Sequence, residues 1–298
     1  MKKIMLFSSM IFAVVFSNIS YVSADENPGD YNVMRIENED KLVVPKEKTK
    51  EVWSYMVERL VNEKTYLKSL DPGFESYYSD ELFIDVYFDS PNLQMLEKKS
   101  GIRHRKRWNL DNLEHKKSGR ELIQVKLNYI DESNELNRGE LKFKIDPSDK
   151  PNTPDELHPV IGLIDKPQRE NFKQRIVELG IDPYSLKKIL IIKQLRHSLY
   201  ITKNSGQFMS IRLDEDSSRK FLVKWEHVEL EPELNEIPYT KATPEERERM
   251  EDISKQIVAD ILKKFPEIKR DLTPKYNKAF EYFEKKIPFF RFLVRHFS

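Results

Sequence analysis

The segment from Met34 to Pro45 constrains the fold most, because it alternates in the way of a β-strand with one highly charged face. Successive side chains of a strand point to opposite faces, so one face carries Arg35, Glu37, Glu39, Lys41 and Val43. At a rise of roughly 3.3 Å per residue, two carboxylates and two cations lie within about 20 Å of one another. Either this face is turned to water, or it lines a polar lumen in which carboxylates hold a metal and cations hold a polyanion. Matching charged faces on later strands would favour the lumen.

The first 24 residues have the pattern of a secretory signal peptide. Lys2 and Lys3 precede the apolar run Ile4–Phe16, and small residues at Val22–Ala24 form a cleavage site. The run is short for a membrane span, which favours cleavage over an uncleaved anchor. We therefore expect an exported protein that is periplasmic or secreted.

The overall charge is nearly balanced, so any anion-binding site must be local. The chain has 51 Lys and Arg residues and 50 Asp and Glu residues, and removal of the two signal lysines leaves 49 against 50, a net charge of −1. No nucleic-acid partner is expected from such a balance. The absence of cysteine excludes disulfides, thiolate chemistry and cysteine-ligated zinc.

Further strands are expected downstream, and several of them repeat the single charged face. In Ile102–Trp108, three arginines share one face, and their guanidinium groups would cradle phosphates if they faced a lumen. The opposite face of that strand carries His104 and Lys106, which do not suit an apolar core. The other expected strands are Leu82–Phe88, Glu121–Asn128, Arg138–Ile145, Ile189–Leu199, Gln207–Asp214 and Phe221–Glu231, with a possible additional one whose limits the pattern does not give.

Amphipathic helices are expected between these strands. Thr243 is the expected N-cap of the helix Pro244–Phe265, because Pro244 and the acidic residues after it suit a helix N-terminus. The other expected helices are Lys48–Glu63, Asn92–Ser100 and Pro167–Gly180. The pattern predicts an α+β fold in which an antiparallel sheet closes into a barrel, with a polar lumen and helices packed outside. We expect the domain to cover residues 33–265, followed by a helical tail at 266–298.

Four motifs in order resemble the CYTH, or triphosphate tunnel metalloenzyme, superfamily. Glu37, Glu39 and Lys41 match its Glu-x-Glu-x-Lys strand, and Tyr87–Leu93 followed by Gly101–Arg107 resembles its next two segments. Arg212-Leu-Asp214 and Glu229-Leu-Glu231 are similar to its late strands. The segment Leu272–Tyr276 has some likeness to the polyphosphate-polymerase branch, the vacuolar transporter chaperone type.

This resemblance implies a tunnel that binds triphosphate or polyphosphate together with Mg²⁺ or Mn²⁺. Catalysis would rest on Glu37, Glu39 and Lys41. The implied metal ligands are Glu37, Glu39, Asp214, Glu229 and Glu231. The implied substrate-binding residues are Lys41, Arg103, Arg105, Lys126, Arg138, Arg196 and Arg212. Gln124 and Gln194 depart from the charged residues often found at these places in the superfamily, and Arg107 and Lys142 fit a lumen or a water-facing rim equally well.

Three functions remain open at this point. The first is a metal-dependent phosphohydrolase that acts on inorganic triphosphate, polyphosphate or an organic triphosphate. The second is a polyphosphate polymerase-like protein, which an exported location disfavours because it needs a nucleotide. The third is a non-catalytic module that binds polyphosphate or another polyanion. The basic, aromatic stretch Lys285–Phe297 is expected to pack on the domain as a terminal helix, with weak membrane-surface contact as the alternative.

Overall fold

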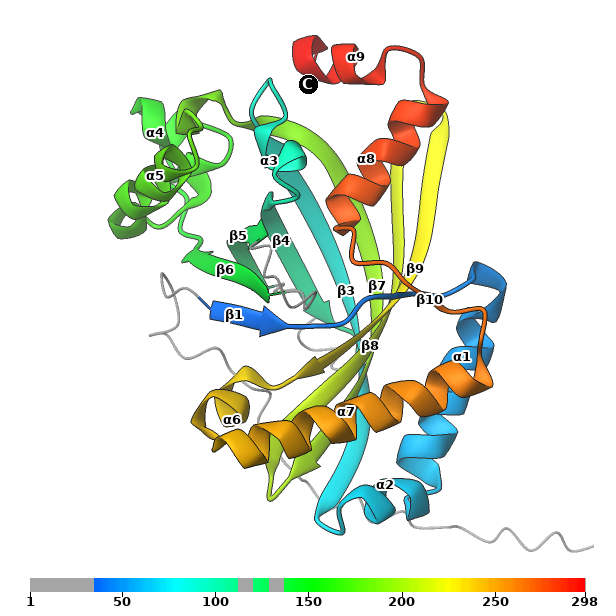
Figure 1. Cartoon of the computed structure of the whole chain (residues 1–298). Helices are drawn as coiled ribbons and strands as arrows, with labels where there is room; N and C mark the ends of the chain where they lie inside the picture. The colour runs from blue at the N-terminus through cyan, green and yellow to red at the C-terminus, as the bar shows by residue number, and fades with distance from the viewer. Residues whose placement is uncertain (1–34, 112–119, 129–136, 298) are drawn as a thin grey trace, which may run out of the picture. The chain divides into compact units, whose positions relative to one another are not determined.

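The computed structural model describes residues 35–111, 120–128 and 137–297, without the side chains of residues 35–38, 137, 138 and 297 (Figure 1). The predicted signal peptide at residues 1–24 lies outside the described residues. From Arg35 onward the described chain belongs to one compact unit of α+β architecture. The predicted domain limits at 33 and 265 therefore stay predictions.

Ten strands of the described chain form one sheet in which every neighbouring pair is antiparallel. Their spatial order is β1-β6-β5-β4-β3-β7-β8-β9-β2-β10. The strands are β1 (Arg35–Asn38), β2 (Leu42–Val43), β3 (Phe74–Asp89), β4 (Gly101–Asn109), β5 (Arg120–Asn128), β6 (Asn137–Lys144), β7 (Lys187–Lys203), β8 (Gly206–Lys220), β9 (Val223–Leu234) and β10 (Lys269–Arg270).

The first charged segment reaches both sides of this sheet. Its first part, β1, pairs with β6, whereas its second part, β2, pairs with β9. Between them, Glu39 forms a bridge to Glu233 of β9. One stretch of chain thus contacts strands that lie far apart in the strand order. The order nevertheless ends at β1 on one side and β10 on the other, so the closed barrel stays a prediction.

The helices lie between and after these strands. They are α1 (Thr49–Val57), α2 (Thr65–Leu70), α3 (Gln94–Glu97), α4 (Pro154–Leu157), α5 (Arg169–Glu178), α6 (Glu236–Lys241), α7 (Pro244–Lys264), α8 (Lys275–Lys286) and α9 (Phe290–Phe297). The predicted N-terminus of α7 is confirmed, because Thr243 accepts a hydrogen bond from the backbone of Glu246 and the Glu246 side chain bonds back to Thr243. None of the helices in the described part of the chain is long and apolar enough to span a membrane.

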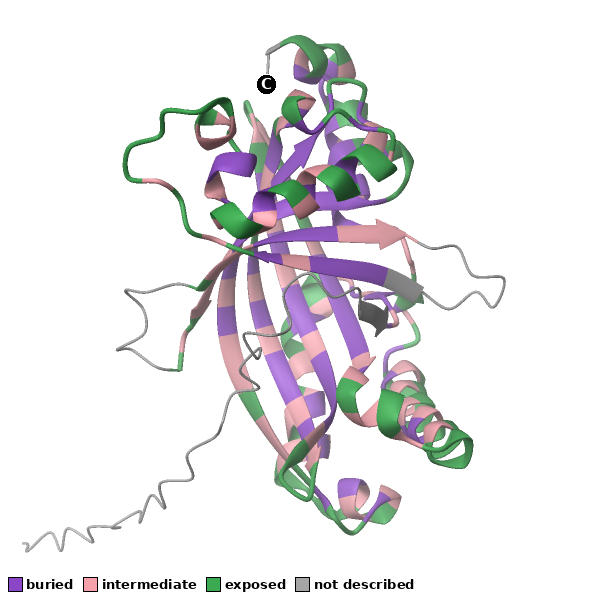
Figure 2. Cartoon of the chain, turned by 90° about the vertical axis from the view of Figure 1, so that its left-hand side faces the viewer, coloured by how far each residue is buried: buried purple, intermediate pink, exposed green. Residues whose placement is uncertain are grey.

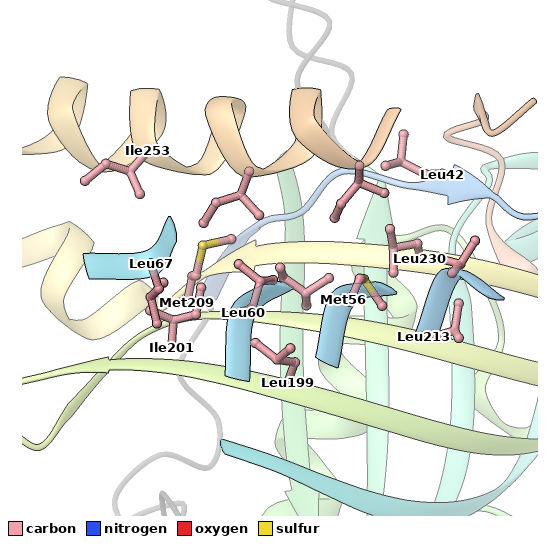
Figure 3. Close-up of a cluster of buried hydrophobic side chains, with 14 of the residues drawn as sticks. Leu42, Met56, Leu60, Leu67, Leu199, Ile201, Met209, Leu213, Leu230 and Ile253 are labelled. Carbon is pink, nitrogen blue, oxygen red and sulfur yellow. The ribbon is translucent and has the colours of Figure 1, made fainter. Parts of the chain in front are cut away.

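The outer face of β7–β9 is covered by α1 and α7. Their apolar side chains meet those of the strands in one buried cluster, which Figure 3 shows in close-up. Buried and partly exposed residues alternate along several of the long strands, as expected for a sheet with two different faces (Figure 2). A second cluster covers the outer face of β4–β6, where Phe143 packs edge-on against Phe172 of α5.

Helix α8 is an exception to the prediction that the helices pack outside. Tyr276 of α8 stacks on Tyr87 of β3 with ring centroids 5.0 Å apart, and Phe280 and Phe283 are fully buried beside it. Tyr87 lies in register with Arg103, so both point to the same, inner face of the sheet. The prediction was wrong for α8, because one part of the inner face is apolar and accepts an amphipathic helix. Phe290 and Val294 of α9 are buried in the same cluster, which confirms that Lys285–Phe297 packs on the domain.

One predicted strand limit needs correction, and the charged outer face of β4 has an explanation. Phe221 lies in the turn between β8 and β9 rather than in a strand, since β9 begins at Val223. The unexpected cations of β4 have a partner on the outer face: Glu121 accepts hydrogen bonds from Lys106 and pairs with His104, both at 2.8 Å. Glu121 on the neighbouring strand β5 therefore compensates the charges of His104 and Lys106 on the outer face of β4.

Replacing Ile257 by alanine is expected to lower the free energy of unfolding by about 2–4 kcal/mol. Ile257 of α7 is 1% exposed and belongs to the cluster between α7 and the sheet, so truncation leaves a cavity. Chemical denaturation of wild type and variant measures this. Glu248→Ala on the exposed side of the same helix is the control, with an expected change within about 0.5 kcal/mol. Equal effects of the two substitutions would contradict the packing described here.

Candidate functional site

The inner face of the sheet carries charged side chains from most of its strands. In an antiparallel pair, residues directly opposite each other point to the same face. The register joins Arg105 to Asp85 across β4 and β3, and Arg196 to Asp214 across β7 and β8. It then joins Asp214 to Glu229 across β8 and β9. Residues far apart in the sequence are thereby placed on one surface.

The acidic cluster occupies the β8–β9 side of this face and consists of Glu39, Asp214, Asp216, Glu229 and Glu231. All five carboxylates are buried, with side chains no more than 6% exposed. Lys41 lies among them: its ammonium group donates to Glu229 at 3.0 Å and to Glu231, and it lies 3.4 Å from Glu39. Glu39 and Lys41 of the Glu-x-Glu-x-Lys motif thus lie beside the Glu229-Leu-Glu231 motif.

Helix α8 contributes a second ammonium group to the acidic cluster. Lys275, its first residue, pairs with Asp214 and lies 3.4 Å from Asp216, 3.5 Å from Glu231 and 3.9 Å from Glu229. One turn later, Lys278 donates to Glu229 at 2.6 Å. The sequence interpretation did not include Lys275 or Lys278 in the site, although the Leu272–Tyr276 motif contains the first of them.

These neighbours determine the charge states of the carboxylates. Burial alone would raise the pKa of Glu229. The charge of Lys41, a hydrogen bond from His227 and the charge of Lys275 outweigh burial and lower the pKa to about 2. The pKa of Glu231 lies well below its usual range, because Lys275, Lys41 and Arg196 outweigh its burial. Asp216 differs: burial, together with Asp214 and the two glutamates, raises its pKa to about 7 despite Lys275.

The basic cluster occupies the β4–β6 side of the same face and consists of Arg103, Arg105, Arg107, Lys126 and Lys142. Arg105 forms a two-point pair with Asp85, at 2.8 and 2.7 Å, and Arg103 donates to Asp85 at 3.0 Å. Although burial raises the pKa of Asp85, these two guanidinium groups lower it to about 2. Among the described side chains, the carboxylates of Glu81, Asp85 and Glu140 face these cations.

Both arginines keep donors in reserve after these contacts. Within the described residues, Arg103 uses its Nε and Nη1 and Arg105 its Nε and Nη2, whereas no hydrogen bond involves Nη2 of Arg103 or Nη1 of Arg105. Phe83 lies below the guanidinium groups of Arg105, Arg107 and Arg196, whose central carbons are 4.4, 5.8 and 5.3 Å from its ring centroid. The guanidinium groups of Arg103 and Arg105 are thus held in place, and each keeps a donor that an anion can use.

Within the described residues, some buried polar atoms of β7 and β8 make no hydrogen bond. Gln194 of β7 lies in register with Asp216 of β8. Neither the amide atoms of Gln194 nor the carboxylate oxygens of Asp216 make a hydrogen bond. Unpaired polar groups in an interior cost free energy, so they usually mark a place where a ligand, an ion or water completes the contacts.

The donor set of the acidic cluster suits Mg²⁺ or Mn²⁺ chemically, because these ions prefer carboxylate oxygens. No group of three or more His, Asp or Glu side chains in the described part of the chain is arranged to hold a metal ion. The ammonium groups of Lys41 and Lys275 lie among these oxygens. The oxygen donors of the cluster thus suit a divalent cation chemically, but their present arrangement holds two lysines. Metal binding is a proposal.

The remaining predicted residues fall into three groups. Arg196 is in the acidic cluster, where it donates to Asp214 at 2.7 and 2.6 Å and to Glu231 at 2.8 Å. Arg212 pairs with Glu233 on the inner face, and Lys126 lies 3.8 Å from Glu140. Glu37 and Arg138 pair in the backbone register of β1 and β6, but their side chains lie outside the described residues.

Comparisons with known proteins do not identify the chain. No family model and no curated protein matches it. Among solved structures, a candidate adenylate cyclase of Bacillus halodurans aligns with a TM-score of 0.47 and 16% identity, over 83% of this chain and 98% of that one. A candidate adenylyl cyclase of Hippeastrum with a dominant triphosphatase activity gives 0.45 and 16%, over 82% and 95%. The Pct1 RNA triphosphatase of S. pombe gives 0.32 and 8%, over 78% of each chain. TM-scores below 0.5 support no conclusion here, so function has to be inferred from the site.

Proposed function

We propose that the inner face of the sheet binds inorganic triphosphate or polyphosphate and hydrolyses it with a divalent metal ion. One observation carries this proposal: a buried acidic cluster and a basic cluster with donors in reserve lie on the same face of one sheet. A linear polyphosphate needs cations along its length and a metal site at the bond to be broken, which are the two functions that these clusters would supply.

The roles of the residues follow from their contacts. Arg103 and Arg105 would bind phosphate oxygens through the guanidinium donors that Asp85 and Gln124 do not use, while Asp85 fixes their orientation. Glu229 and Glu231, with Glu39 and Asp214, would hold Mg²⁺ or Mn²⁺, with Glu37 as a further proposed ligand. The bound ion would stabilise charge on the terminal phosphoryl group as water attacks in line.

Gln194 and Asp216 support a ligand on this face, since their buried polar atoms make no hydrogen bond within the described residues, although the Lys275 ammonium lies 3.4 Å from Asp216. Burial and the neighbouring carboxylates raise the pKa of Asp216. The predicted signal peptide supports the proposal that this activity lies outside the cytoplasm, in the periplasm or the medium.

Substitution of Glu231 by glutamine is expected to reduce metal-dependent phosphate release from triphosphate by about 100-fold or more. The change keeps the side-chain shape but removes a carboxylate that Lys41 and Arg196 contact. Phosphate release is measured with Mg²⁺, with Mn²⁺ and with a chelator. Glu226→Gln is the matched control, since Glu226 lies on the same strand, exposed to solvent, and its loss is expected to leave turnover unchanged.

The same assay separates the alternatives. The carboxylates of the acidic cluster already have ammonium partners, which favours the non-catalytic binding module as the second candidate. Polyphosphate binding without metal-dependent release by the wild type would establish that module and refute the hydrolase. Chain growth from a nucleoside triphosphate, with no release from triphosphate, would instead establish a polymerase.

A further inference from the structure

Four large apolar side chains project into solvent at one end of the sheet. Phe221 and Leu222 form the turn between β8 and β9 and are 68% and 97% exposed. Phe289, which precedes α9, and Phe292 within it are 82% and 55% exposed. We call these four residues the apolar tips. They make up four of the nine exposed large apolar side chains in the described part of the chain, so their gathering at one end requires an explanation.

Packing beneath the tips shows that the two segments lie together. Trp225, which follows the β8–β9 turn, belongs to the same buried cluster as Phe290 and Val294 of α9, and Val223 packs against this cluster. The start of β7 is also at this end, because Lys187 donates to the carbonyl oxygens of Val294 and Arg295, both at 2.7 Å. Figure 1 shows the end of the β8–β9 hairpin and the connection from α8 to α9 at the same end of the structure.

The backbone at two of the tips takes a conformation that phenylalanine rarely adopts. Phe221 has φ +51° and Phe289 has φ +56°, in the left-handed region that favours glycine or asparagine. The β7–β8 turn at the other end of the same strands instead has the polar pair Asn204 and Ser205. Neither backbone preference nor core packing accounts for exposed phenylalanine at these two positions, which points to a function.

The segments that carry the tips are basic. Arg219–Lys224 contains three cations and no acid, and Lys285–Ser298 contains four and no acid. Burial and the nearby positive charge of Lys188 both lower the pKa of Lys220. Within the described residues, no carboxylate lies within ion-pair distance of a cation in the set Lys188, Arg219, Lys220, Lys285, Lys286 and Arg295. This charge is therefore available to an anionic partner.

We propose that this end of the protein docks on an anionic lipid bilayer, with the apolar tips inserted at the interface and the surrounding cations on the lipid headgroups. Separate phenylalanine and leucine side chains on turns, surrounded by lysine and arginine, fit a surface that is apolar inside and negatively charged outside. The buried side of α9, with Phe290 and Val294, stays packed on the domain, so insertion is shallow and needs no unfolding. This surface is separate from the acidic and basic clusters and does not depend on the proposed hydrolase.

A single introduced cysteine tests insertion at the tip itself, because the chain has no native cysteine. Leu222→Cys in the full chain, labelled with the fluorophore NBD, is mixed with phosphatidylcholine vesicles with and without phosphatidylglycerol. We expect a blue shift and an intensity gain with the anionic vesicles. Leu157→Cys, at a position 68% exposed on α4, is the matched control and is expected to show neither change. An unchanged spectrum at Leu222 would overturn the proposal. This holds even if the apolar N-terminal residues 1–24 bind the vesicles by themselves.

Vesicle sedimentation of unlabelled full-length chains provides the quantitative test. We expect Phe221→Ser with Leu222→Ser to weaken binding by about tenfold or more, because the apolar area that enters the bilayer is lost. Lys285→Gln with Lys286→Gln should weaken it by roughly fivefold per lysine and reduce its salt dependence. Binding equal to wild type in both variants would refute the proposal. Dimerisation in solution that the tip variant abolishes, without vesicle binding, would instead assign the surface to a second copy of the chain.

Discussion

Asparagine in place of Asp85 is expected to lower the free energy of unfolding by about 3–5 kcal/mol, because it leaves two buried guanidinium groups without their shared counter-ion. Asp85 is 1% exposed and accepts from both Arg103 and Arg105. These arginines lower its pKa from 3.8 to about 2, although burial raises it. The stabilisation is therefore complete above about pH 4 and is lost as the pH falls through about 2. Chemical denaturation at pH 7 and at lower pH values measures both effects.

Glu75→Gln provides the control for Asp85→Asn. Glu75 lies on the same strand and pairs with Lys64 and Lys68, but its side chain is 56% exposed, so its loss should cost at most about 1 kcal/mol. The melting temperature in the presence of triphosphate, without metal, provides a second measurement. Triphosphate should raise the melting temperature of Asp85→Asn more than that of the wild type, since phosphate oxygens can replace the lost carboxylate. Equal costs for the two substitutions would show that Asp85 does not hold the basic cluster together.

Much of the site could be predicted because the side chains of a strand alternate with a period of exactly two residues. Once a segment is known to be a strand, Glu39 and Lys41 must share a face, as must Glu229 and Glu231. The structure brings these side chains together: the Lys41 ammonium lies 3.4 Å from Glu39 and donates to both Glu229 and Glu231. The predicted continuous strand is wrong, however, because Asp40 and Lys41 lie between β1 and β2. The alternation also predicted that Arg103 and Arg105 share a face, and the register with Asp85 confirms it.

The parts that could not be predicted depend on tertiary packing. Lys275 begins a helix, and nothing in the local pattern of a helix says which side of a sheet it will cover. Its place in the acidic cluster follows from the stacking of Tyr276 on Tyr87, which requires an apolar part of the inner face. Asp85 was missed for another reason. Its strand was predicted correctly, but a single aspartate on a strand is typical of an exposed position, and the sequence does not show that β4 places Arg105 opposite it. Closure of the sheet depends on long-range pairing, which periodicity does not determine.

Methionine in place of Lys275 is expected to lower the free energy of unfolding at neutral pH by about 3–5 kcal/mol, because four buried carboxylates lose a shared cation. Lys275 is 7% exposed and contacts Asp214, Asp216, Glu229 and Glu231. Part of this cost should disappear in acid. Glu229 has a pKa lowered to about 2, and the stabilisation that this represents is present above about pH 4.5 and is lost as the pH falls through about 2. The difference between wild type and Lys275→Met should therefore shrink over that range.

The same variant tests whether the acidic cluster accepts a divalent cation. Without the ammonium group of Lys275, Mg²⁺ or Mn²⁺ can restore the missing positive charge, so either ion should raise the melting temperature of Lys275→Met more than that of the wild type. Thermal denaturation with each ion and with a chelator measures this independently of catalysis. Lys255→Met on α7 is the control: its side chain is 67% exposed and 3.4 Å from Glu251, so its loss should cost at most about 0.5 kcal/mol without a metal effect. A Lys275→Met protein that is destabilised yet indifferent to both ions would show that the cluster is built around lysine and not around a metal. The binding module would then explain the structure better than the hydrolase.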